Sequence, residues 1–455
     1  MRATMLGARW AASLLAWVGM ALTVGAQSVA DPFVPVIVRE GEVDTSEEAQ
    51  APDVSGRDTN RSVPGPILVP LPSAGPPAAQ PPPVTLRLPP PQRWPLMRWL
   101  QGTWAGTELE DQRTQVYGWT QGNFTASTDR DSNLPLGMNY KANQFLLEQN
   151  WLRIDRTVVN TGTSEPTFGF RSDWILPGSD YFFTLPRGLF NGQLTANKGQ
   201  PNLYGIDPVQ FYAEAYFPTV AQGMDVKVGR FFTQYGVEQI SAPDNALVSH
   251  AYAFIYDPFT QTGVLTTTKL NNSVSVQAGL VVGNDNFSGP TLNPTFIGSV
   301  KWVRFDQRDS LLFNVIADKG RFDQKNNFHN PEILDLVATH KITTNLLYSF
   351  EGLYGFTDNV PDIGTANWMS ILHYLTYNFT EQCNGATRLE FFDDFQGQRT
   401  GFKGLYTALA AMLAYRPVKW LQLRQELRYD YHTETAPFEG KHGLFTAASD
   451  FIVRW

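Results

Sequence analysis

The sequence predicts an all-β fold, a transmembrane antiparallel β-barrel of about 16 strands. Three features predict it: an aromatic C-terminal segment, a polar–apolar alternation along most of the chain, and connections that alternate between short and long. Hydrophobic residues make up 42% of the chain and aromatic residues 13%, yet the mean hydropathy is −0.24. A membrane barrel explains this combination, because each strand turns one face to lipid and the other to water.

The C-terminal segment, residues 443–455, has the pattern of a strand with one lipid-facing side. In an extended chain its polar residues share one face: Thr446, Asp450 and Arg454. Its apolar residues share the other face: Phe445, Ala447, Phe451, Val453 and Trp455. Few soluble strands end a chain on exposed aromatic residues, whereas aromatic residues border the lipid-facing band of a membrane barrel.

The clearest alternation lies at residues 421–432, where charged and apolar residues take turns. A helix would scatter the two sets around its axis, whereas a strand separates them onto two faces. The same reading along the chain predicts sixteen strands, with the register of 263–270, 295–305 and 332–341 left open. The predicted strands are 115–127, 143–155, 167–175, 208–217, 224–232, 263–270, 273–283, 295–305, 310–318, 332–341, 346–356, 367–380, 384–393, 403–415, 421–432 and 443–455.

The predicted connections support an even number of strands with both ends on one side of the membrane. Turns on the side of the termini are short: 218–223, 306–309, 342–345 and 416–420. Loops on the other side are longer: 176–207, 233–262, 319–331 and 433–442. Residues 156–166 are the one turn that is too long for this pattern. Membrane barrels show this asymmetry, with short inner turns and long outer loops.

The N-terminal region has the organisation of an exported protein. Residues 1–26 form the predicted signal peptide: Arg2 and Arg9 precede or flank a short apolar run, and small residues end at Ala26. A buried N-terminal helix is the alternative. Residues 27–95 are first acidic and then rich in proline, which predicts a disordered or semi-rigid periplasmic spacer. A cell-wall or protein ligand for this spacer is the alternative.

Residues 96–114 follow the spacer as a tryptophan-rich segment, and the predicted barrel occupies 115–455. Trp94, Trp99 and Trp104 lie close together in sequence. Such clustering suits an interfacial segment or a short helix at the barrel mouth, and simple core packing explains it equally well.

Charge, cysteine content and motifs exclude several classes of protein. The net charge of −8 argues against a nucleic-acid partner. The single cysteine, Cys383, allows neither an intramolecular disulfide nor a cysteine-rich metal site. The six histidines are scattered, and we find no nucleophile, metalloprotease or phosphate-binding motif. We therefore expect no enzymatic activity, no catalytic residue, no metal and no cofactor.

Charged residues on the predicted inner face carry both signs. The expected pore-lining residues are Arg171, Asp173, Glu214, Lys227, Arg388, Glu390, Arg424, Glu426, Arg428, Asp430 and Arg454. Facing charges in a pore set its ion preference through their local balance. Ion pairs that only stiffen the wall are the second interpretation, and both can hold together.

The loop at 233–262 is too rich in aromatic residues for a solvated loop tip. We expect it to fold into the lumen and narrow the pore, with an outer cap on neighbouring loops as the alternative. The residues assigned to this constriction are Glu238, Asp244, His250, Tyr252 and Asp257.

The chain also resembles a known family, the OmpL-like β-barrel porins of outer membranes. The resemblance rests on YGWTQGNFT at 117–125, NWLRIDR at 150–156, FGFRSD at 168–173, KVGRFFTQYG at 227–236 and FIVRW at 451–455. The resemblance covers roughly residues 93–455 and depends on the order of the motifs more than on any single motif.

The resemblance implies an outer-membrane pore, surrounded by lipid, for passive diffusion of small hydrophilic solutes or ions. It implies that Phe451, Val453 and Trp455 form the signal read by the barrel-assembly machinery, although many barrels end in Phe rather than Trp. An envelope protein whose barrel is only a structural or adhesive anchor is the second functional hypothesis. Whether the barrel forms a homo-oligomer is left open.

Overall fold

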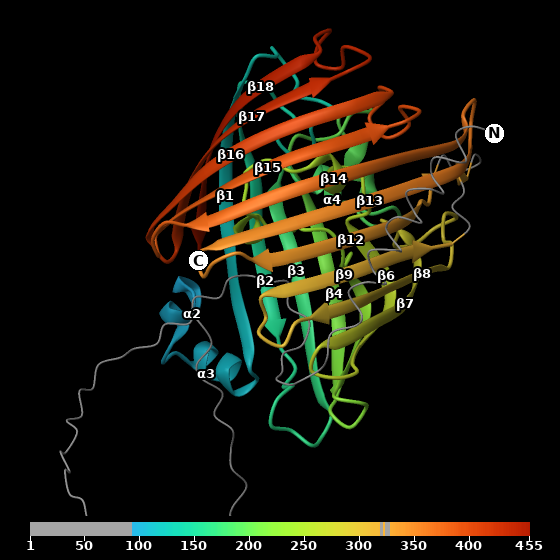
Figure 1. The fold of residues 1–455 in the computed structure, drawn as a ribbon. Helices are drawn as coiled ribbons and strands as arrows, with labels where there is room; N and C mark the ends of the chain where they lie inside the picture. Colours follow the sequence, from blue (N-terminus) through green and yellow to red (C-terminus); the bar gives the residue numbers. More distant parts are fainter. Residues whose placement is uncertain (1–92, 319–321, 324–327) are drawn as a thin grey trace, which may run out of the picture. The chain divides into compact units, whose positions relative to one another are not determined.

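The computed structural model describes residues 93–455 except 319–321 and 324–327. Within these residues, sixteen strands close into one antiparallel barrel in which each strand pairs with its neighbours in sequence (Figure 1). The strands are β1 Thr114–Ser127, β2 Gln144–Arg156, β3 Thr167–Gly178, β4 Gly205–Phe217, β5 Met224–Phe232, β6 Thr260–Lys269, β7 Val274–Asn284, β8 Thr295–Val303, β9 Asp309–Ala317, β12 Glu332–Lys341, β13 Leu346–Val360, β14 Gly364–Asn378, β15 Cys383–Asp394, β16 Gly404–Val418, β17 Leu421–His432 and β18 Gly443–Arg454.

The connections and the segment before β1 contain short strands and helices. Two short strands, β10 Phe322–Asp323 and β11 Phe328–His329, pair with each other in the loop between β9 and β12. The helices are α2 Pro95–Leu100, α3 Trp104–Asp111, α4 Tyr181–Thr184, α5 Tyr252–Ile255 and the 3-10 turns η1 Asn191–Leu194 and η2 Ala242–Asp244. Of the described residues, no helix is both long and apolar enough to cross a membrane.

The predicted fold class and all sixteen predicted strands are confirmed, with shifts of a few residues at the strand ends. For example, β6 begins at Thr260 rather than at residue 263. The predicted signal peptide (1–26) and nearly all of the predicted spacer (27–95) lie outside the described residues.

Strand β17 shows why this sequence forms a barrel. Leu423, Leu427 and Tyr429 are exposed on its outer face, whereas Arg424 and Arg428 on its inner face are buried. This alternation matches the two-residue period of a strand. A shift of one residue would move the arginines to the apolar outer face, so the burial of one face fixes the register.

The barrel closes where β1 meets β18, in the register Trp119 with Arg454 and Gly122 with Phe451. Gly122 is required here by a close approach: a Cβ atom at this position would lie 2.6 Å from the ring of Phe145 and 2.8 Å from that of Phe451. These two rings stack across the glycine, with centroids 6.5 Å apart. The predicted terminal strand therefore closes the barrel.

The two ends of the barrel differ, and we call them the short-turn end and the long-loop end. The short-turn end carries the chain's C-terminus and tight turns such as 270–273 and 342–345; the long-loop end carries 128–143, 179–204 and 233–259. Two connections break the pattern. Residues 157–166 form a long connection at the short-turn end, and residues 361–363 form a short one at the long-loop end, because β13 and β14 extend further than their neighbours.

Strand β4 departs from simple alternation at one place. The pairing with β3 shifts between Asp173–Gln210 and Ile175–Asp207, so that β4 contributes one more residue than β3 to this interval. Val209, which alternation alone places on the outer face with Phe211, is instead fully buried in an apolar cluster with Ile175 and Trp151. A β-bulge explains the difference, because it redirects side chains locally.

A charge on the outer face of β17 should destabilise the barrel. Leu427→Arg is expected to lower the free energy of unfolding by about 2–4 kcal/mol if the site lies near mid-membrane. Gln422→Arg should cost less, because Gln422 is on the inner face near the short-turn end of the same strand. Denaturant unfolding in lipid vesicles measures both. Equal losses at the two positions would show that the face assignment of β17 is wrong.

Candidate functional site: the lumen and the loop bound inside it

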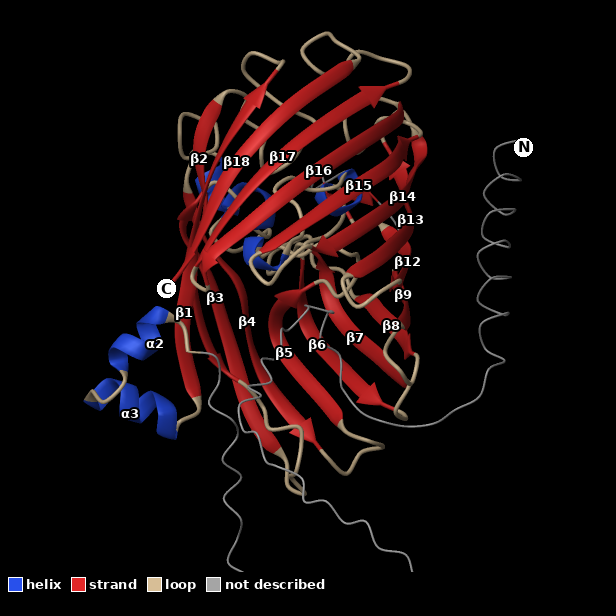
Figure 2. Cartoon of the chain, turned by 60° about the vertical axis from the view of Figure 1, so that its left-hand side comes forward, coloured by secondary structure: helices blue, strands red, loops and turns tan. Residues whose placement is uncertain are grey.

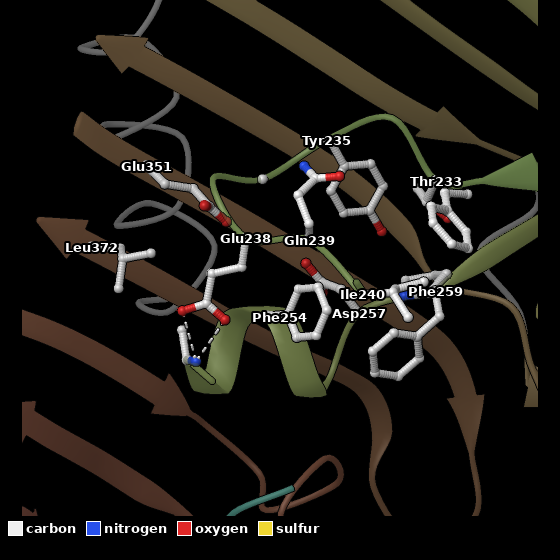
Figure 3. A pocket seen from close by; sticks show the side chains of 14 residues that line it. Thr233, Tyr235, Glu238, Gln239, Ile240, Phe254, Asp257, Phe259, Glu351 and Leu372 are labelled. Atoms are coloured by element: carbon white, nitrogen blue, oxygen red, sulfur yellow. Dashed lines mark hydrogen bonds between the residues drawn. The ribbon is translucent and has the colours of Figure 1, made fainter. Parts of the chain in front are cut away.

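One long loop, residues 233–259 between β5 and β6, is bound to the inner face of the barrel wall. Its first contacts are with β12 and β13: Gly236 N–H donates to Asp335 Oδ2 at 3.2 Å, and Val237 N–H donates to Glu351 Oε2 at 2.7 Å. Figure 3 shows the Glu351 carboxylate directed toward this part of the loop. In Figure 2, loops and short helices lie within the space enclosed by the strands.

Glu238 lies at the centre of a buried polar cluster that joins the loop to the wall. Its carboxylate accepts a hydrogen bond from Arg388 Nη1 at 2.7 Å, contacts His250 Nδ1 at 2.7 Å, and accepts a hydrogen bond from the Tyr374 hydroxyl. Ala251 N–H also donates to it, at 3.1 Å (Figure 3). Burial raises the pKa of Glu238, but the positive charge of Arg388, with His250, outweighs burial and lowers the pKa to about 2.

The following part of the loop binds carboxylates of β15 and β17. Tyr252 N–H and Ala253 N–H both donate to Glu390 at 2.8 Å. These groups open helix α5, so Glu390 satisfies backbone donors that a helix start leaves without partners. Val248 N–H donates to Glu426 Oε2 at 2.6 Å.

Arginines of the same wall bind the loop's backbone carbonyl groups. Arg424 Nη1 donates to Leu247 O at 2.9 Å, and Arg428 Nη1 donates to His250 O at 2.6 Å. Arg424 also pairs with Asp450 of β18, with its Nε 3.0 Å from Oδ1. Each guanidinium therefore joins a wall carboxylate to the loop, which matches its fixed fork of several donors.

These contacts make the loop and the wall depend on each other. A hydrogen bond to a charged group contributes about 1.5–3 kcal/mol, whereas a buried charge that loses its partner costs about 3–5 kcal/mol. The wall charges on β15 and β17 are almost completely buried, so they need the loop as a partner. The loop's backbone groups, removed from water, need the charges in turn.

Six of the predicted pore-lining residues belong to this sealed part of the wall. All six face inward as predicted, but all are buried behind the loop instead of facing an open lumen: Arg388, Glu390, Arg424, Glu426, Arg428 and Asp430. Sequence alternation gives the face of a strand; it does not show what covers that face.

Four of the other five predicted pore-lining residues lie on β3, β4 and β5, where two ion pairs remain partly exposed. Lys227 Nζ is 3.6 Å from Glu214 Oε1, with side chains 23% and 15% exposed. Arg171 Nη2 is 2.9 Å from Asp155 Oδ2, with side chains 27% and 11% exposed. In both pairs the cation is the more exposed partner.

Asp173 is the exception among these residues, because its side chain is fully buried. It accepts hydrogen bonds from Arg153 Nε at 2.7 Å and from Gln210 Nε2 at 2.6 Å. Arg153 in turn lies over the rings of Tyr117 and Trp119, at 5.7 and 5.4 Å from their centroids. Asp173 is therefore placed to orient Arg153.

Arg454 and Asp244 lie near the short-turn end. Arg454 Nη2 donates to Pro243 O at 3.3 Å, which brings the tip of the loop to the end of β18. Asp244 accepts a hydrogen bond from Ser241 Oγ at 2.5 Å and interacts electrostatically with Arg153 and Arg454. Its side chain is only partly buried.

The other residues assigned to the constriction are in the buried seam between loop and wall: Glu238, His250, Tyr252 and Asp257. Tyr252 donates from its hydroxyl to Asp430 Oδ1 at 3.0 Å. Asp257 lines a small cavity of about 30 Å³ beside Tyr235 and Glu238 (Figure 3). Burial raises the pKa of Asp257 well above its usual range despite the opposing positive charge of Arg399.

Four wall residues that hold the loop were not predicted from the sequence: Gln149, Asp335, Glu351 and Tyr374. Gln149 Nε2 donates to Ile240 O at 2.7 Å, which extends the contact of the loop to β2. The sequence does indicate that each of these residues faces inward, because each occupies an inward position in a predicted strand. It does not show the path of the loop, and that path decides which inward residues contact it.

Another buried cation, Arg230, joins the long loop 179–204 to the barrel. Arg230 of β5 is fully buried and pairs with Asp207, with Nη1 2.6 Å from Oδ1. It also donates to Thr184 O and to Pro208 O, both at 2.6 Å. This arrangement fixes α4 to the ends of β4 and β5.

The residues predicted as an assembly signal lie on β18 or directly after it. Phe451, Val453 and Trp455 are half-buried. Trp455 N–H donates to Gly118 O at 2.9 Å, and its Nε1 donates to Thr120 Oγ1 at 3.3 Å. The last residue is thus part of the closure between β18 and β1.

A comparison with solved structures found one of an outer-membrane channel that shares this fold, and others with lower similarity scores. The outer membrane channel DcaP of Acinetobacter baumannii is 13% identical, with a TM-score of 0.50, and the match covers 75% of this chain and 97% of that one. The anion-selective porin of Comamonas acidovorans is 9% identical, with a TM-score of 0.48 and coverage of 75% and 99%. A loop L8 deletion mutant of OmpT of Vibrio cholerae is 10% identical, with a TM-score of 0.49 and the same coverage.

Similarity in sequence identifies the family. No curated protein matches the chain. The model of the family described as putative beta-barrel porin-2, OmpL-like, matches residues 113–454, a range that includes all sixteen strands of the barrel. The resemblance stated from the motifs is thereby confirmed, and the chain belongs to the OmpL-like β-barrel porin family of outer-membrane proteins.

Proposed function

We propose that small hydrophilic solutes cross this porin by passive diffusion along the part of the lumen beside β3–β5, and that loop 233–259 narrows this path. One observation carries the proposal: the loop is bound to β12–β18, while ion pairs on β3–β5 keep part of their surface exposed. Charges in a pore act on a solute only where the solute can approach them. The cations of this open wall and the partly exposed Asp244 are therefore the charges that a solute meets.

Export and assembly belong to the same proposal. We infer that residues 1–26 direct export and that Phe451, Val453 and Trp455 are read by the barrel-assembly machinery, with lipid around the outer face. The position of Phe451, Val453 and Trp455 at the strand that closes the barrel supports their role in assembly. We further infer that the chain has no catalytic role, because the buried charges of the lumen serve to hold the loop.

Removal of the middle of the loop should widen the path. A variant that lacks residues 245–255 loses the segment bound to Glu390 and Glu426, and we expect its single-channel conductance in planar bilayers to exceed that of the intact protein. Heat-modifiable migration checks that the barrel still folds. Unchanged conductance in a folded variant would place the constriction elsewhere. A folded, intact protein without conductance would favour the barrel as an anchor.

The ion pair at Glu238 should hold the loop in place. Glu238→Gln leaves the buried Arg388 without its charged partner on the loop, which is expected to weaken docking of the loop by about 3–5 kcal/mol. Limited proteolysis of the folded barrel should then cleave within 233–259. Glu434→Gln is the matched control, because its pair with Lys403 is exposed. Equal protease resistance of the two variants would contradict this role of Glu238.

Asp244 should influence ion selectivity, whereas Asp257 should not. Asp244→Asn removes a partly exposed negative charge beside the path, so the reversal potential in a salt gradient should shift toward anion preference. The shift should shrink at high salt because ions screen exposed charges. Asp257→Asn changes a buried group and should leave the reversal potential as it is. A larger shift for Asp257→Asn would mean that the path runs through the seam.

A further inference from the structure

Helices α2 and α3 form a helical hairpin, residues 95–111, that precedes the barrel. The family match begins at residue 113, so the hairpin is a feature of this chain outside the matched barrel. Figures 1 and 2 both show the two helices beside β1 and outside the ring of strands.

The hairpin covers a free edge of β1. Pairing between β1 and β18 starts at Trp119 and Arg454, while β1 continues to Thr114 in its pairing with β2. The start of β1 therefore lacks a strand neighbour on one side. Val116 N–H on that side donates to Met97 Sδ at 3.3 Å, and Met97 is buried. An uncovered strand edge would attract other chains, so covering it favours the closed barrel.

The hairpin has a defined internal structure. Thr103 caps α3 by accepting a hydrogen bond from Gly106 N–H at 3.1 Å. A Cβ atom on Gly106 would lie 2.0 Å from Leu100 O, so the two helices approach each other at a glycine. A salt bridge joins Arg93, two residues before α2, to Glu110 of α3, with Nη2 2.9 Å from Oε1.

A further contact attaches the hairpin to the last strand. The guanidinium of Arg454 lies over the ring of Trp94, 4.8 Å from its centroid. A cation over a tryptophan face is attracted by the ring's electron density. The hairpin is therefore held at both β1 and β18.

Its two other tryptophans point away from the protein. Trp99 is 76% exposed and Trp104 is 85% exposed, more than any other large apolar side chain among the described residues. A water-facing position for two such rings is unfavourable, since burial of large apolar side chains stabilises a protein. These rings therefore need a partner surface.

We propose that the helical hairpin is a lipid anchor, with Trp99 and Trp104 inserted at the boundary between headgroups and acyl chains of the leaflet nearest the short-turn end. The hairpin lies outside the ring of strands (Figure 2), and the outer face of those strands carries many exposed apolar residues. We infer that the two exposed tryptophans meet the same lipid as that outer face. Tryptophan favours this boundary because its ring is apolar while its N–H needs a polar partner.

The charges of the hairpin indicate whether it should prefer anionic or zwitterionic lipid. It carries one arginine, Arg98, and three carboxylates, Glu108, Glu110 and Asp111. Binding to anionic lipid would require several basic residues. The hairpin has only one, so its charges do not favour anionic lipid. The anchor should therefore act through its aromatic rings and should hold equally well in zwitterionic phosphatidylcholine.

Fluorescence quenching in vesicles tests the anchor on the full-length protein. In a Cys383→Ser background, Gln101→Cys places an environment-sensitive label between the two tryptophans, and Arg130→Cys places a control label on an exposed loop. In phosphatidylcholine vesicles, a nitroxide on the lipid chains should quench the label at 101 several-fold more than the label at 130. Addition of anionic lipid should not increase this quenching.

Two further variants test whether the tryptophan rings themselves hold the hairpin in lipid. Trp99→Ala with Trp104→Ala should reduce lipid quenching at 101 to the control value, while Trp99→Phe with Trp104→Phe should retain part of it. Heat-modifiable migration confirms that each barrel is folded. Quenching at 101 by aqueous iodide to the same extent as at 130 would overturn the proposal. The proposal would also be overturned if the label at 101 were protected from iodide at high protein density but not after dilution of the protein in lipid. That result would show that a second copy of the chain covers the two tryptophans.

Discussion

The structure inside this barrel depends on one constraint: charges that β15, β17 and β18 place on the inner face of the wall must find partners once water is excluded. The backbone of loop 233–259 supplies them. Glu390 and Glu426 receive loop N–H groups, Arg424 and Arg428 donate to loop carbonyls, and Glu238 brings a loop carboxylate to Arg388. Loop and wall would each carry a large desolvation cost alone. Bound together, they form a fixed inner lining, which is why the loop follows the wall from β12 to β2 instead of hanging freely in the lumen.

This constraint divides the lumen into two unlike parts. Charges behind the loop are satisfied and inaccessible, so they act on the position of the loop and only indirectly on a solute. The charged side chains on β3–β5 remain partly exposed, and the cation of each pair is more exposed than the carboxylate. We therefore propose that few charged groups set the ion selectivity, although the inner face of the whole barrel carries many. The same division is the reason that we predict different roles for Asp244, at the tip of the loop, and Asp257, in the seam, despite their similar place in the sequence.

Much of the fold follows from the sequence, because a membrane strand must separate polar from apolar residues with a period of two. This requirement predicts the sixteen strands, the inward face of Arg388 and Arg428, and the terminal strand at Trp455. It could not predict the bulge that buries Val209, since a bulge changes the period locally. Nor could it show that Glu390 lies behind the loop, or that Asp335 and Glu351 hold the start of the loop, because such contacts join residues far apart in sequence. Aromatic content indicated that the loop needs a partner surface, but the choice of wall required the structure.

The loop is proposed to seal one side of the lumen and to leave the other open. The most direct measurement is the rate at which a charged thiol reagent modifies single cysteines placed on the two walls of the folded, conducting protein in a Cys383→Ser background. Lys227→Cys places the thiol on the wall assigned to the path. Ala410→Cys places it on the inner face of β16, where Ala410 is buried in one cluster with Leu247 and Ala251 of the loop. We predict fast modification at 227 with a change in single-channel conductance, and slow modification at 410 with none. Equal rates at the two positions, or faster modification at 410, would contradict a wall sealed by the loop.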